Sequence, residues 1–275
     1  MITPLLPMRL SGVLWYQGEA NAGDPASYAC RFPAMITDWR KHFGSIELPF
    51  FYVQLAAFHD DYSWIRAAQG AALDLEFVSV AVAIDLGDPT SPAGSIHSRR
   101  KQDVGRRLAL DILKVIYDIG SGSGGPELVD VDIRKVSNEL GLKDVSPRSL
   151  VQLQLGNTRV PVLAGTAACS ECCYELPFET LNAVTGNWAR VAKAIVSGNS
   201  EILLESGSAN NVVGVRYGWE GYPQCALYDT TRPHLPMAPF QWCRYGGELP
   251  PWAEDSCDVS RRQPTTESTA LLRGS

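Results

Sequence analysis

The chain has 275 residues, of which 45% are hydrophobic and 20% charged, so it can bury a core as one large domain or two modest ones. Its 30 acidic and 24 basic residues give a formal net charge of −6, and its longest basic run is the three residues 99–101, which argues against a nucleic-acid-binding groove. No segment approaches the roughly 20 consecutive apolar residues of a membrane span, and the first residues lack the pattern of a signal peptide.

The first 120 residues predict an α/β fold in which strands and helices alternate. Buried strands are expected at 13–16, 50–55 and 77–84, and helices at about 25–43, 64–75 and 98–117. The first helix has the clearest start, because Asp24 offers an N-cap and Pro25 follows at the first helical position. Strands joined through helices of this length form parallel sheets, whose ligands bind at the carboxyl ends of the strands.

After the glycine-rich stretch 120–125 the sequence changes to short apolar runs separated by Gly, Pro and Asn, which predicts a β-rich region. From about Gly246 the chain offers little to bury. We therefore predict an α/β unit at 1–119, a β-rich domain at 126–245 and a disordered tail at 246–275.

Six of the seven cysteines lie in the second half, and this clustering indicates disulfides. Cys30 instead falls in the first predicted helix, where we expect a small buried hydrophobe. The segment CSECC at 169–173 contains a CxxC, but no second pair or histidine follows at zinc-finger spacing. We therefore expect no metal and no other cofactor.

Two loops that follow predicted strands carry residue types suited to catalysis. The first contains Gln17, Glu19 and Asn21, and the second ends in His97. A histidine at a cleft edge can act as a general base, although a lone one is more often a polar helix cap. A side-chain amide such as that of Gln17 can donate a hydrogen bond to an oxyanion, and Glu19 either orients a catalytic group or caps the next helix.

The stretch GVLWYQGEAN at 12–21, together with DLGDPTSPAGSIH at 85–97, resembles the sialate O-acetylesterase family, which is similar to the SGNH hydrolases in its catalytic half. The resemblance continues through the Cys172–Cys173 pair to about Phe240. It implies a flavodoxin-like sheet and an esterase that removes O-acetyl groups from sialic acids. It also implies His97 as the base and Gln17 in the oxyanion hole.

The resemblance also shows what is missing. The family carries its nucleophilic serine in a GQSN-like motif upstream of the WYQGE block, and no such motif occurs in this sequence. We therefore expect a C-terminal portion of an esterase, inactive by itself. A carbohydrate-binding fragment and a non-functional truncation product remain as alternatives.

The sequence does not decide which residue is the acid of the catalytic triad or which residues bind the sugar carboxylate. Many SGNH hydrolases carry an Asp three residues before the histidine, but Gly94 occupies that position, so Asp88 is the first choice for the acid, ahead of Asp85 and Glu19 or a Ser-His dyad. Because sialic acid is a carboxylate, Arg66, Arg99 and Arg100 are candidate ligands, and each could equally lie on a solvated helix face.

For the expected partners and location, the resemblance implies an O-acetylated sialic acid or a related acetylated sugar as ligand. It implies a lysosomal or extracellular location for the full-length form, whereas the chain translated as given would be cytoplasmic. Asn21 is expected to contact the sugar beside Arg66 and Arg99.

Overall fold

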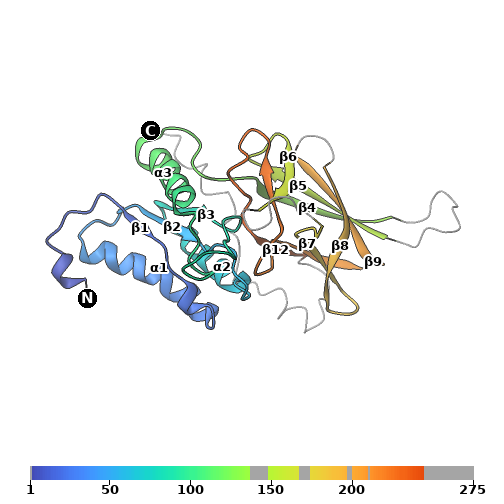
Figure 1. The fold of residues 1–275 in the computed structure, drawn as a ribbon, viewed down its shortest axis with the longest axis horizontal. Coiled ribbons are helices and arrows are strands. Elements are labelled where there is room, and N and C mark those ends of the chain that lie inside the picture. Colours follow the sequence, from blue (N-terminus) through green and yellow to red (C-terminus); the bar gives the residue numbers. More distant parts are fainter. Residues whose placement is uncertain (1, 137–147, 167–173, 197–199, 210, 245–275) are drawn as a thin grey trace, which may run out of the picture.

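The computed structural model describes residues 2–136, 148–166, 174–196, 200–209 and 211–244. Figure 1 shows two units side by side, an α/β unit built from the first part of the chain and a β-rich unit built from the second. The mixed fold class predicted from the sequence is confirmed. The predicted tail at 246–275 and the CSECC segment lie outside the described residues.

A parallel sheet of three strands forms the centre of the α/β unit, in the order β1 (Val13–Trp15), β2 (Phe50–Gln54) and β3 (Val78–Val82). The helices are α1 (Pro25–His42), α2 (Ser63–Gln69) and α3 (Lys101–Tyr117). Three short 3-10 helices complete the unit: η1 (Thr3–Leu5), η2 (Glu19–Asn21) and η3 (Gly70–Asp74). The predicted strands and helices are present with two differences: the helix expected at 64–75 divides into α2 and η3, and α3 begins three residues later than expected.

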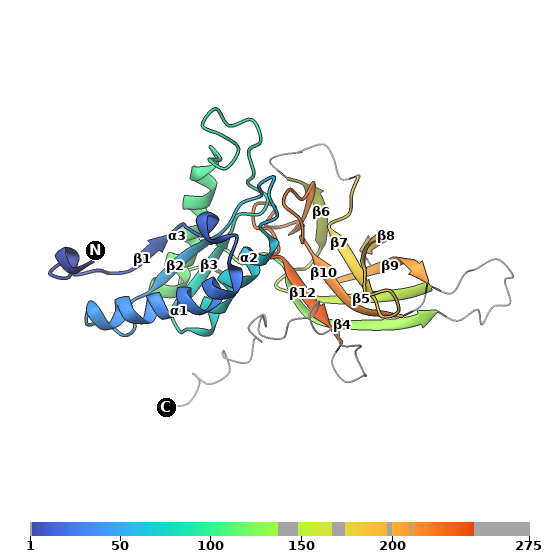
Figure 2. The ribbon, with the colours of Figure 1, turned by 90° about the horizontal axis from the view of Figure 1, so that it is seen from below.

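Helices cover both faces of this sheet (Figure 2). Successive side chains of β2 point to opposite faces, so each set packs against the helices on its own side. Phe50 and Tyr52 are buried in a cluster with residues of α1 and α2, whereas Phe51 and Val53 are buried in a second cluster with residues of α3. All five residues of β2 are buried, as the continuous apolar run predicts.

Helix α1 begins as the sequence predicts, with the Asp24 carboxylate accepting a hydrogen bond of 3.2 Å from the Ser27 N–H. Its buried face includes Tyr28, Phe32 and Ile36. Cys30, however, is a free thiol and exposed, so the prediction of a buried residue is wrong. At about 100° per residue, position 30 lies some 200° from position 28 and so faces away from the sheet.

Strand β1 differs from the prediction of a buried strand. It lies at an edge, with β2 as its partner within the described part of the chain. Its central residue, Leu14, is 57% exposed, while Val13 and Trp15 are half-buried.

The β-rich unit consists mainly of one antiparallel sheet of seven strands, ordered β12-β10-β7-β8-β9-β5-β4, with β6 and β11 paired separately. The strands are β4 (Glu127–Val136), β5 (Arg148–Gly156), β6 (Pro161–Gly165), β7 (Phe178–Asn182), β8 (Trp188–Val196), β9 (Glu201–Ala209), β10 (Val212–Tyr217), β11 (Cys225–Asp229) and β12 (Phe240–Cys243). Residues from both ends of the sheet, such as Val131 on β4 and Phe240 on β12, share one core, so the sheet wraps around it.

Cys225 and Cys243 are both disulfide-bonded, which confirms that the second half contains disulfides.

Within the described residues, no helix is both long enough and apolar enough to cross a membrane.

The two units are packed tightly against each other. The rings of Trp64 and Trp219 meet edge to face with centroids 5.2 Å apart, and the Phe58 N–H donates to the Gly221 carbonyl over 3.0 Å. Gly87 lies so close to this junction that a Cβ atom there would be 2.6 Å from the Tyr222 ring and 2.9 Å from the Ala57 Cβ. Any side chain at position 87 would therefore push the units apart.

Candidate active site

The loop after β1 holds Gln17 in a fixed orientation. The Gln17 Nε2 donates to the Asn21 Oδ1 over 2.6 Å, and its Oε1 accepts a hydrogen bond from the Tyr28 hydroxyl over 3.3 Å. The Gln17 carbonyl accepts a further hydrogen bond of 3.2 Å from the buried Gln69. A side-chain amide held on both sides is preorganised to donate its remaining N–H to an oxyanion.

Gly18 allows this loop to turn. Its φ of +146° lies in a region that residues with a side chain rarely adopt. A Cβ atom there would also come within 3.3 Å of the Leu55 side chain and 3.4 Å of Gln69. The glycine thus brings Gln17 and Glu19 close to the end of the sheet.

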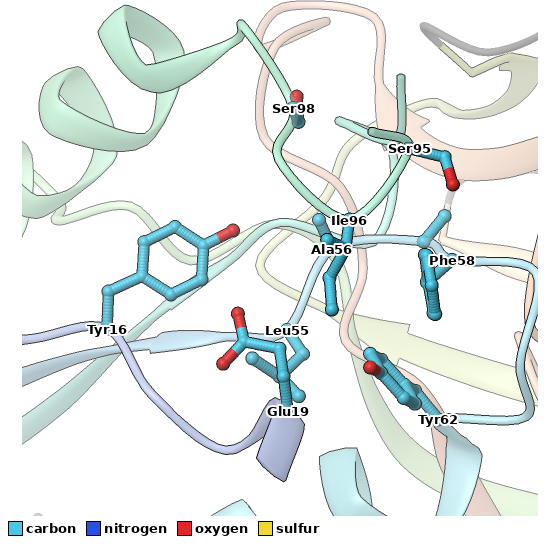
Figure 3. Close-up of a pocket in the computed structure, with 10 residues that line it drawn as sticks. Tyr16, Glu19, Leu55, Ala56, Phe58, Tyr62, Ser95, Ile96 and Ser98 are labelled. Carbon is cyan, nitrogen blue, oxygen red and sulfur yellow. The ribbon is translucent and has the colours of Figure 1, made fainter. Parts of the chain in front are cut away.

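A cavity of about 380 Å³ brings the two predicted loops together. Its lining comprises Tyr16, Gln17, Glu19, Ala20, Ile96, His97 and Lys101. A smaller pocket shares Tyr16, Glu19 and Ile96 with it and extends towards Phe58 and Tyr62. In Figure 3 the Glu19 carboxylate lies between the rings of Tyr16 and Tyr62. Gln17, Glu19 and His97, which were expected together because both loops follow strands at one end of the sheet, therefore line the same cavity.

Glu19 influences the ionisation of its neighbour. Burial, together with the negative charge of Glu19, raises the pKa of the Tyr16 hydroxyl to about 12. Tyr16 therefore stays a neutral phenol at physiological pH and presents an uncharged ring to the cavity.

The His97 ring is exposed, and its hydrogen-bond partner among the described residues is the Ala93 carbonyl, 3.0 Å from Nδ1. A carbonyl at this distance favours the tautomer in which Nδ1 carries the proton, which leaves Nε2 free to accept one. His97 lies in the loop four residues before α3, so it does not open the helix as predicted.

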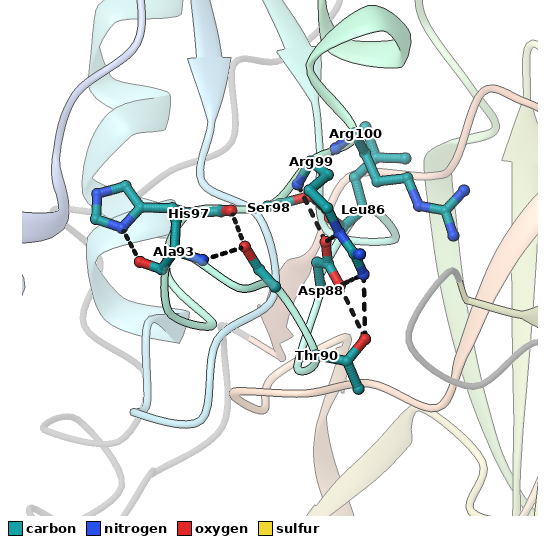
Figure 4. A network of polar contacts seen from close by, with 9 residues as sticks. Leu86, Asp88, Thr90, Ala93, His97, Ser98, Arg99 and Arg100 are labelled. Carbon is teal, nitrogen blue, oxygen red and sulfur yellow. Dashed lines mark hydrogen bonds and ion pairs between the residues drawn. The ribbon is translucent and has the colours of Figure 1, made fainter.

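Asp88, the first choice for the acid, makes its contacts elsewhere (Figure 4). Its oxygens accept hydrogen bonds from the Arg99 Nε over 2.6 Å and the Arg99 Nη2 over 2.9 Å. These bonds hold the pKa of the Asp88 carboxyl far below its usual range. Asp85 is likewise engaged, with Arg107 at 2.6 Å and the Tyr228 hydroxyl at 3.0 Å. Both carboxylates anchor the loop, and neither contacts the His97 ring.

The predicted sugar ligands are mostly not at the cavity. Arg66 is fully buried and donates to the carbonyls of Leu55, Ala56, Glu220 and Gly221. This corrects its expected role, because a guanidinium enclosed by carbonyls joins the two units and cannot reach a ligand. Asn21 contacts Gln17, and Arg99 pairs with Asp88, although its side chain remains 59% exposed.

The serines that flank His97 do not contact its ring. Ser98 is buried and donates to the Leu86 carbonyl over 2.7 Å. Ser95 lies 3.4 Å from the Nδ1 of a different histidine, His59. Within the described residues, His97 therefore has no hydroxyl partner that it could activate.

Sequence reasoning missed Tyr16 and Lys101, which complete the cavity wall. Lys101 lies over the Tyr16 ring, with its Nζ 4.4 Å from the centroid. Lys101 follows Arg99 and Arg100 directly, and this position could have identified it as a further candidate to bind the carboxylate.

Comparisons with known proteins identify the family. Residues 3–114 match a family described as carbohydrate esterase, sialic acid-specific acetylesterase, and residues 148–244 match the sialate O-acetylesterase C-terminal domain. The Mus musculus sialate O-acetylesterase is 33% identical over 265 residues, covering 87% of this chain and 46% of that protein. The Homo sapiens protein of the same name is 32% identical over 269 residues, covering 87% and 47%.

The chain thus spans about half the length of the curated relatives it matches. A crystal structure described as a novel carbohydrate acetylesterase from Xanthomonas citri superposes with a TM-score of 0.70 at 29% identity, covering 89% of this chain and 53% of that one. Both family matches, the relatives and the fold point the same way: the chain belongs to the sialate O-acetylesterase family.

Proposed function

We propose that this chain supplies the histidine and the oxyanion-binding amide of an esterase that, in its full-length form, hydrolyses O-acetyl esters of sialic acids. The observation that carries the proposal is the cavity in which Gln17 and Glu19 from one loop meet His97 from another. The names of the family and of the mouse and human relatives support the choice of substrate.

In this reaction His97 removes the proton from a serine hydroxyl through Nε2, while the Ala93 carbonyl holds the ring at Nδ1. The serine attacks the acetyl carbonyl, and Gln17 donates to the oxyanion that forms. The protonated His97 then gives its proton to the departing sugar oxygen, which leaves an acetyl-serine. A water molecule that His97 deprotonates attacks this ester, so that acetate is released and the serine is restored. Glu19 lies in the same cavity as a hydrogen-bond acceptor for the sugar or for His97. Asn21 acts through Gln17, and Asp88 acts by holding the loop through Arg99.

The nucleophilic serine is not among the hydroxyls that the described residues place near His97. We therefore expect the 275-residue chain to release no acetate from an O-acetylated sialic acid above the buffer rate, both as the native sequence and as His97→Ala. Turnover that disappears in His97→Ala would show that a residue of this chain serves as nucleophile.

The full-length form provides the positive test. It should release acetate from an O-acetylated sialic acid, and a folded full-length protein without that activity would overturn the proposal. In that case a carbohydrate-binding role, favoured by the open cavity of about 380 Å³, becomes the better explanation. The disulfide-bonded Cys225 and Cys243 support an oxidising location, lysosomal or extracellular, for the full-length form.

A further inference from the structure

Lys101 lies in the lining of the large cavity together with His97. It is the first residue of α3, a helix that runs to Tyr117, so the positive end of the helix dipole lies beside its side chain. Because they share this lining, Lys101, Gln17 and His97 face the same space.

Lys101 makes no ion pair within the described structure. Arg99 and Arg107, the cations nearest in sequence that make ion pairs, are paired with Asp88 and Asp85. On the same helix, Lys114 pairs with Asp118 at 2.6 Å. Lys101 has no such carboxylate partner among the described residues, which leaves its charge available to a ligand.

The Tyr16 ring restrains this lysine. The Nζ lies 4.4 Å from the ring centroid, within the range of a cation–π interaction. The phenol of Tyr16 stays neutral up to high pH because it is buried, so the ring face keeps its attraction for the ammonium. A restrained lysine loses less conformational freedom when it binds an anion than a free one does.

We propose that Lys101 binds the carboxylate of the sugar and makes the cavity prefer acidic sugars over neutral ones. The identity of the sugar rests on the proposed function, whereas the preference for a carboxylate rests on the lysine. Glu19 repels a carboxylate in the same cavity, so the carboxylate lies on the Lys101 side and the sugar hydroxyls lie towards Glu19.

The test compares N-acetylneuraminic acid with its neutral methyl ester, using titration calorimetry on the 275-residue chain. We expect the acid to bind about tenfold more tightly than the ester, which is the effect of one charge-assisted hydrogen bond. Lys101→Met should bring the ratio close to one, and Lys101→Arg should keep most of it. Lys114→Met is the matched control, because it removes a lysine of the same helix that lies away from the cavity.

A ratio that persists in Lys101→Met overturns the inference, as does failure of the unsubstituted chain to bind the acid. Thermal melts of each variant show whether it is folded. Neither sugar carries an ester that the enzyme cleaves, so this result is independent of acetate release by the full-length form. If acetate is released but the ratio is one, the esterase proposal stands and the role of Lys101 falls.

Discussion

At the scale of single residues, the orientation of His97 is the feature closest to the chemistry. The ring is held by the Ala93 carbonyl, and the carboxylates of the same loop are engaged by arginines. A carbonyl fixes the tautomer as a carboxylate does, but it carries no full charge to stabilise the imidazolium that forms during proton transfer. In the proposed reaction, Gln17, fixed on both sides, contributes a second, separable part of the catalysis.

Substitutions of these two residues should lower kcat to different extents. In the full-length form, His97→Ala should lower kcat by about 10³ or more, because the serine loses its base. Gln17→Ala should lower kcat by roughly 10² to 10³ with little change in KM, because an oxyanion donor acts mainly in the transition state. Steady-state kinetics on an O-acetylated sialic acid measures both. A rise in KM alone for Gln17→Ala would instead identify a ground-state contact with the sugar.

The ion pair between Asp88 and Arg99 should make stability depend on pH in a defined direction. The two hydrogen bonds from the Arg99 side chain, and a third from its backbone N–H, lower the pKa of Asp88 in the folded state. A lowered pKa contributes stability above the unfolded value, and that contribution is lost as the pH falls through the folded value. Arg99→Met should therefore lower Tm at pH 7, and the difference from the unsubstituted chain should shrink below about pH 4.

Thermal melts between pH 3 and pH 8 test this dependence. Arg100→Met is the matched control, since Arg100 is an exposed neighbour without an ion pair in the described structure. A Tm difference for Arg99→Met that stays constant down to pH 3 would contradict the assignment of the effect to Asp88.

At the scale of elements, α2 carries one of the connections between the two units. Arg66 on α2 donates to Leu55 and Ala56 near the end of β2 and to Glu220 and Gly221 of the β-rich unit. Burial lowers the pKa of its guanidinium to about 10, so the side chain remains charged at neutral pH. A buried cation of this kind is held only while its acceptors stay in place.

Arg66→Met should therefore lower the free energy of unfolding by at least about 3 kcal/mol, because it leaves buried carbonyls without donors. Arg31→Met, on the exposed face of α1, makes the same chemical change and should cost within about 0.5 kcal/mol. Denaturant unfolding measures both values. Equal, small effects would mean that water replaces the guanidinium at these carbonyls.

Helices and strands could be predicted from the sequence more readily than the long-range contacts between them. The strand–helix alternation, the cap at Asp24 and the meeting of Gln17 with His97 follow from local patterns and from the geometry of parallel sheets. The burial of Arg66 depends on carbonyls more than 150 residues away, which no local pattern records. The order of the seven-stranded sheet likewise depends on long-range pairing.

At the scale of the whole molecule, the exposed edge of the sheet at β1 should govern association. The strand has β2 on one side, and Leu14 is 57% exposed. An edge strand with an apolar side chain promotes pairing between molecules. We expect the 275-residue chain to self-associate at tens of micromolar, and Leu14→Lys to shift it towards monomer.

Sedimentation velocity over a range of concentrations tests this expectation. Ile46→Lys is the control, because Ile46 is 80% exposed but lies in a turn outside the strands. If Ile46→Lys and Leu14→Lys reduce association equally, general hydrophobicity rather than the β1 edge is responsible.

The loop from Asp85 to Ser98 has anchored residues near its two ends and an exposed segment between them. Asp85, Asp88 and Ser98 hold it to the framework, whereas the segment from Pro92 to His97 is largely exposed. Substitutions in that segment touch little of the core, so selection for folding constrains them weakly. A lineage can therefore change the residues around His97 while keeping the same scaffold, so proteins of one fold can differ in this segment.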